Sequence, residues 1–181
     1  MKLSQLSSSA LRMLGNCMLT KAALAINLAS AATIKTGSSL SYIVDGVYKT
    51  LATLAAQALT PIAGFTFFTQ PENTTVYYVL AIDGTTGAVV TVQGGYDGQL
   101  INNGGIVSYG QSVVPDVPDL TGTAALGGLQ TMGTIYTPFG GIKVVVKPGQ
   151  TWRPGTDALD NATKATYTFY DFAYLPAQDR I

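Results

Sequence analysis

The sequence of 181 residues contains no histidine, one cysteine and one glutamate. Histidine is the commonest general base and a frequent zinc ligand, so its absence removes Ser-His-Asp and Cys-His catalysis and most catalytic zinc sites. The single Cys17 allows no internal disulfide. We therefore expect a protein that is not an enzyme and that holds no catalytic residue, no metal and no cofactor.

Charge is also scarce, because only 11% of the residues are Asp, Glu, Lys or Arg, less than half the share of about 25% in soluble domains. A surface with so little charge suits a chain that is held in an assembly. The few cations are neither clustered nor interleaved with aromatic residues, and the apolar runs are shorter than the roughly 20 residues of a membrane span. We expect no nucleic acid and no membrane among the partners.

The charges that are present are distributed unevenly along the chain. Residues 1–49 carry five Lys or Arg and a single acidic group, Asp45, whereas residues 50–142 carry acidic groups alone. A basic front and an acidic middle would attract each other between neighbouring copies, although dispersed, solvated charge explains the same pattern.

Apolar residues recur at helical spacing over residues 1–32, with polar side chains on the opposite face. The pattern predicts an N-terminal helical arm, which is too marginal to be stable alone. It would pack on its own domain, or on a partner or another copy of the chain, and docking on a partner is preferred. The residues expected to bind that partner are Leu3, Leu6, Leu11, Met13, Leu14 and Met18.

The rest of the chain, residues 33–181, has the sequence pattern of β-hairpins, in which short strands alternate with turn residues. Asp45-Gly46, with strands predicted at 39–44 and 47–51, fits a two-residue primed turn. A second hairpin is predicted from strands 75–82 and 88–93. Further strands are predicted at 64–69, 132–136, 141–147 and 165–173, with "TPFGG" as a turn and residues 94–111 as a glycine-rich loop.

These elements predict a mainly β protein, with an antiparallel β-sandwich or barrel-like body and an N-terminal helical arm. The expected organisation is an anchoring arm over 1–32 and a β-rich body over 33–181.

Two further motifs have a plain structural explanation. The carboxylates of "PDVPD" lack the six or more spaced oxygen ligands of a calcium site. Most of the aromatic residues are expected to pack in the core.

Three aromatic residues are nevertheless retained as possible surface contacts. Tyr96 and Tyr109 lie on the glycine-rich loop, and Trp152 lies in the long connection "KPGQTWRPGTDALD". Aromatic side chains on loops can stack on sugars, so these three residues are the contacts expected if the chain binds a glycan or a receptor.

The order of segments resembles that of small structural virion proteins of tailed bacteriophages. The similar features are an alanine-rich start, the "YIVDGVY" and "YYVLAIDGTTGAVVTVQGG" hairpins, the connector "VPDVPDLTG", and the "LQTMGTIYTPFGGIKVVV" and "GQTWRPGTDALD" stretches. The similarity covers roughly residues 31–176 and is one of pattern. It implies a non-enzymatic role as a capsid decoration (cement) or head-fibre component.

The preferred hypothesis is a decoration protein on the virion capsid surface, made in the cytoplasm of a bacterial host. It would form a homotrimer and bridge subunits of the major capsid protein, or bind another virion protein, through its arm. The alternative is a tail, fibre or neck protein that binds a receptor or a glycan.

Overall fold

The computed structural model describes residues 17–44, 46–63, 65–94, 100–102, 105–108 and 136–172. The described part is mainly β, and all its paired strands are antiparallel. The strands are β1 (Cys17–Met18), β2 (Leu24–Ile26), β3 (Thr33–Thr36), β4 (Leu40–Val44), β5 (Val47–Leu51), β6 (Gln57–Ala58), β7 (Thr75–Asp83), β8 (Val89–Gln93), β9 (Leu100–Asn102), β10 (Gly105–Ser108), β11 (Tyr136–Val146) and β12 (Ala165–Asp171).

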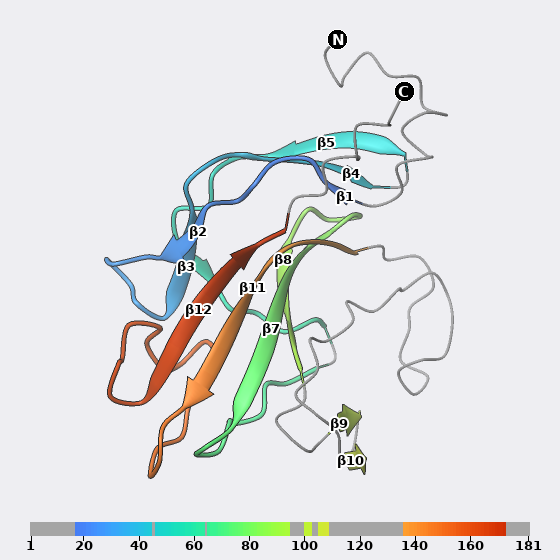
Figure 1. Cartoon of the computed structure of the whole chain (residues 1–181). Coiled ribbons are helices and arrows are strands. Elements are labelled where there is room, and N and C mark those ends of the chain that lie inside the picture. Colours follow the sequence, from blue (N-terminus) through green and yellow to red (C-terminus); the bar gives the residue numbers. More distant parts are fainter. Residues whose placement is uncertain are drawn as a thin grey trace, which may run out of the picture.

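A four-stranded sheet of order β12-β11-β7-β8 forms the largest layer (Figure 1). A three-stranded sheet, β1-β4-β5, crosses one end of it, and a second small sheet, β2-β3-β6, flanks the β12 side. The strands β9 and β10 form a separate two-stranded pair.

One apolar core joins the three larger sheets. Side chains from β3, β4, β7 and β11 contribute to it, together with Trp152 and Leu159 from the connection between β11 and β12. Both of these last side chains are 0% exposed. Alternation along β7 explains its share of the core, because Val76, Tyr78 and Leu80 point to the same face of the strand.

Both predicted hairpins are confirmed. Val44 pairs with Val47 across a two-residue turn in which Gly46 has φ of +69°, the left-handed region that the turn requires. The second hairpin joins β7 to β8, and the Asp83 carboxylate accepts hydrogen bonds from the backbone N–H of Thr85 (2.8 Å) and Thr86 (3.0 Å). This bonding is the reason that aspartate favours such turns.

The helix predicted over residues 1–32 is wrong for residues 17–32, where the structure has β1, β2 and turns. Cys17 pairs with Ile43 of β4, and Leu24 pairs with Thr36 of β3. Residues 17–32 are therefore hydrogen-bonded to strands on the far side of the expected boundary at residue 32, and they belong to the β-body. Residues 1–16 lie outside the described part.

Three predictions about strands are also wrong. No strand occurs over the described residues 65–69, and the glycine-rich 94–111 segment includes β9 and β10. "TPFGG" is not a turn, because it lies within the continuous strand β11. The register with β7 shifts between Pro138 and Gly140, and such a bulge accommodates a proline that cannot donate to the ladder.

The packing explains why glycine occupies position 140. A Cβ atom there would lie 2.2 Å from Cδ1 of Leu24 and 2.8 Å from the carbonyl oxygen of Tyr170. Both distances are shorter than any ordinary van der Waals contact, so the absent side chain allows β2 to approach the β11–β12 pair.

Because residues 17–32 contribute to the core, the two plausible truncations should behave differently. Removing residues 1–32 deletes the buried Met18 and Ala22, which are 2% and 0% exposed, and removes β1 and β2. Loss of even one large core side chain costs about 2–5 kcal/mol, so we expect this chain to lose its cooperative thermal transition. A chain lacking only residues 1–16 should retain it, as measured by circular dichroism. Equal melting of the two truncated chains would contradict the strand assignment.

Candidate functional site

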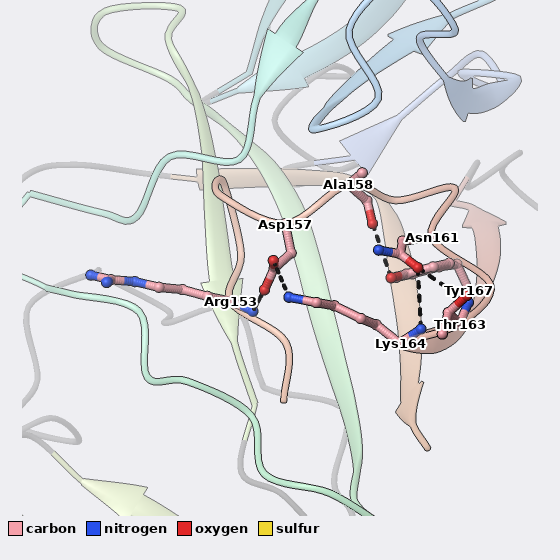
Figure 2. A network of polar contacts seen from close by, with 7 residues as sticks. All are labelled: Arg153, Asp157, Ala158, Asn161, Thr163, Lys164 and Tyr167. Atoms are coloured by element: carbon pink, nitrogen blue, oxygen red, sulfur yellow. Dashed lines mark hydrogen bonds and ion pairs between the residues drawn. The ribbon is translucent and has the colours of Figure 1, made fainter. Parts of the chain in front are cut away.

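A network of polar contacts lies in the connection between β11 and β12 (Figure 2). The Asp157 carboxylate is at its centre. One oxygen accepts a hydrogen bond from the backbone N–H of Arg153 at 2.7 Å, and the other pairs with the ammonium group of Lys164 at 2.6 Å. Both oxygens of Asp157 are therefore engaged in holding the connection in shape.

Asn161 and Tyr167 extend this network toward β12. The side-chain oxygen of Asn161 accepts hydrogen bonds from the backbone N–H of Thr163 and Lys164, at 3.2 and 3.3 Å. The Tyr167 hydroxyl donates to the Ala158 carbonyl at 3.0 Å. Burial, with the nearby carboxylates Asp157 and Asp160, raises the pKa of Tyr167 to about 12. The hydroxyl thus stays protonated near neutral pH and remains a donor.

A second polar network lies inside the core, around Gln70. This side chain is 0% exposed. Its amide donates to the carbonyls of Thr74 (2.9 Å) and Val144 (3.0 Å), and its oxygen accepts from the Tyr78 hydroxyl (3.2 Å). The Tyr78 hydroxyl in turn accepts from Gln93 at 3.1 Å. Every polar atom of the Gln70 side chain is satisfied, as burial requires.

The ionisable side chains of these two networks are bonded within the chain. The Asp157 carboxylate is paired with the Lys164 ammonium group and accepts from the Arg153 N–H. Burial raises the pKa of Tyr78 above its ordinary value. Within the described ranges, no three His, Cys, Asp or Glu side chains come together as a metal site would need. No helix in the described part is long and apolar enough to cross a membrane.

Trp152, expected as a surface contact, is instead a core residue with 0% exposure. Its ring meets those of Tyr78 and Tyr167 edge to face, with centroids 5.3 and 5.9 Å away. Its backbone exchanges two hydrogen bonds with Gln70. A ligand at the surface of this chain cannot reach the indole, so this part of the prediction is wrong.

The other predicted contacts are not brought together in the described structure. Met18 is buried in β1 and packs in the core, so it is not available to a partner. Residues Leu3, Leu6, Leu11, Met13, Leu14, Tyr96 and Tyr109 lie outside the described residues.

Sequence reasoning missed Gln70 and the Asp157–Lys164 pair. A lone glutamine before a proline carries no signal of burial. Asp157 and Lys164 are seven residues apart in an irregular connection, where no periodicity predicts that two side chains meet.

Comparisons with known proteins gave no match to any family model, curated protein or solved structure.

The placement of Trp152 predicts a large effect on stability. Trp152→Ala removes a fully buried ring and should lower the free energy of unfolding by about 3–5 kcal/mol, while Trp152→Phe should cost less because it refills part of the volume. Chemical denaturation followed by circular dichroism measures both. If Trp152→Ala unfolds at the same denaturant concentration as the unaltered chain, the core position is refuted.

Asp157 and its neighbour Asp160 provide a matched pair. Asp157→Ala leaves Lys164 and the Arg153 N–H without their acceptor, so we expect a loss of about 1–2 kcal/mol, since the group is part-exposed and solvent screens the ion pair. Asp160 is exposed, and Asp160→Ala should stay within about 0.5 kcal/mol. Denaturation at low and high salt tests this. Equal effects of the two substitutions would show that the network does not hold the connection.

Proposed function

We propose that this protein is a non-enzymatic structural component of a tailed-phage virion, and specifically a capsid decoration or cement protein. Its body would be a β-sandwich-like unit on the head surface, where three copies assemble into a homotrimer that bridges subunits of the major capsid protein. The similarity of segment order, the low charge and the mainly β fold support this proposal.

The observation that carries the proposal is the attachment of β1 to the body. Residues 1–16, whose apolar pattern predicts partner binding, lead directly into Cys17 and Met18, which pair with Ile43 and Tyr42 of β4. Leu19 then donates to the Ser41 carbonyl at 2.8 Å. A pull on the N-terminal segment would therefore act along hydrogen-bonded strands whose side chains are in the core.

This arrangement suits a cement protein for a mechanical reason. Load along a strand that is hydrogen-bonded at its side is shared among several bonds, whereas load on a strand that is unpaired where it enters the body would act on fewer contacts. Apolar contacts contribute about 25 cal/mol per Å² of buried surface. Repetition of a modest contact around a shell would resist internal pressure.

In this proposal the anchor ends at residue 16 rather than at residue 32, because β1 and β2 pair with strands of the body. In this proposal Leu3, Leu6, Leu11, Met13 and Leu14 hold the capsid, and Met18 holds the body together.

The test uses phage heads that lack this protein, obtained by deleting its gene. We expect the full chain to bind these heads and to raise the temperature at which they release DNA. The chain lacking residues 1–16 should stay folded in solution and fail to bind. Cosedimentation and a fluorescent DNA-release assay measure the two effects.

A matched variant, Leu6→Asp with Leu11→Asp in the full chain, separates loss of apolar contact from loss of length, and it should behave like the truncated chain. Binding of the truncated chain as tight as that of the full chain would refute the anchor. Attachment to tails alone would favour the tail or fibre alternative.

A further inference from the structure

β5 is the outer strand of the β1-β4-β5 sheet. Antiparallel pairs alternate between those that exchange backbone hydrogen bonds and those that turn their N–H and C=O groups outward. Ser41 is opposite Thr50, and the Ser41 carbonyl points away from β5, because it accepts from Leu19 at 2.8 Å. Thr50 therefore points its backbone groups to the free edge, and so does Tyr48, two residues earlier.

These outward groups have no acceptor or donor among the described residues. The hydrogen bonds between described residues include none to the backbone N–H or C=O of Tyr48 or Thr50. Another sheet edge is covered: Thr91 of β8 donates to the Thr60 carbonyl at 2.7 Å and forms a bridge with Pro61. An edge that presents such groups is a template for another strand.

The side chains of β5 do not hinder another strand from pairing with this edge. Lysine commonly blunts an edge strand by keeping its charge where an incoming strand would lie. The one charged side chain of β5, Lys49, instead donates to the Gly84 carbonyl at 2.6 Å, which ties its ammonium group to the β7–β8 turn. Val47 is 53% exposed, and the strand contains neither proline nor a bulge.

We propose that β5 pairs antiparallel with β5 of a second copy of this chain, about a twofold axis at Thr50. A copy of the same strand offers the same unpaired donors and acceptors, so the edges complement each other without a third component. The formal net charge of the chain is zero, so the copies do not repel one another at long range.

The register follows from Lys49. An axis at Lys49 would use the same outward groups but would place Lys49 opposite its equivalent. Each ammonium group would stay bonded to the Gly84 carbonyl of its own copy, but the two like charges would still lie on the same face of the joined sheet, which is unfavourable. An axis at Thr50 places Thr50 opposite Thr50 and Lys49 opposite Leu51 of the second copy. The two β1-β4-β5 sheets then form one continuous six-stranded sheet.

This contact goes beyond the proposed function and does not depend on it. A five-residue strand covers much less than the ~800 Å² per partner of a standard interface, so pairing in solution should be weak, with a dissociation constant on the order of 0.1 mM. On a head, the same contact would link decoration units in pairs, and repetition would strengthen it.

The experiment compares three full-length chains by sedimentation equilibrium from about 10 µM to 1 mM, a range that spans the expected dissociation constant. The unaltered chain should show a monomer–dimer equilibrium. Thr50→Pro should weaken it at least tenfold, because proline removes an outward N–H that no described residue accepts. Thr50→Ala keeps that N–H and should change the constant less than threefold.

Two results would overturn the proposal: a chain that stays monomeric throughout this range, or a Thr50→Pro chain that dimerises like the unaltered one. Circular dichroism verifies that the proline variant is folded. Should it not fold, Thr50→Cys decides, because Cα atoms about 5.5 Å apart across the axis permit a disulfide. Oxidation should then give a covalent dimer, with Thr50→Ser as the control for Cys17. Absence of that dimer would overturn the proposal.

Amide hydrogen exchange identifies any other occupant of the edge. Protection of the Thr50 amide, which faces its equivalent across the axis, should rise with protein concentration. Protection that is independent of concentration would mean that this chain itself covers the edge, and would overturn the proposal. None of these outcomes depends on binding to phage heads, so this inference and the proposed function fail separately.

Discussion

The fold depends on the closure of the β11–β12 connection onto the four-stranded sheet through Gln70 and Trp152. The two backbones exchange a pair of hydrogen bonds, while the glutamine side chain bonds to Val144 and Tyr78 and the indole packs between Tyr78 and Tyr167. A buried amide without these partners would cost several kcal/mol. These contacts hold the start of the connection against the sheet, and the same connection places Leu159 in the core and Asp157 beside Lys164.

This closure explains why a chain with so few charges has an ordered 18-residue connection. The loop includes one ion pair, Asp157–Lys164, and owes its order to backbone contacts. Leu159 donates to Ala31 at 2.8 Å, which also ties the connection to the turn between β2 and β3. Hydrogen bonds and apolar packing thus stabilise this connection, in place of the ion pairs that charged side chains form on many protein surfaces.

The sequence predicts the features that neighbouring residues determine, and it misses those that depend on contacts between residues far apart in the chain. Asp45-Gly46 and Asp83 set their hairpins through turn chemistry within a few residues, and those hairpins were predicted nearly to the residue. The segment 17–32 was predicted as helix because its apolar spacing suits one, but its strands pair with β3 and β4, and their hydrogen bonds outweigh a marginal helical preference. Pro138 and its glycines suggested a turn, since nothing local shows that a bulge and the approach of Leu24 require them. The burial of Trp152, likewise, was set by Gln70, which is 82 residues away along the chain.

The two surfaces that the proposals use are on opposite sides of the same small sheet. β4 lies in the centre, with β1, which follows residue 16 in the chain, on one side and β5 on the other. The outward backbone groups of β5 have no partner among the described residues. In an antiparallel sheet, a strand added at one edge polarises and stiffens the bonds of the next. Contact between copies at β5 would therefore brace the strand that carries β1, and would stiffen the attachment of the anchor. An anchor at one edge and a self-pairing strand at the other would couple attachment to a shell with links between neighbours. A single three-stranded sheet is enough for both.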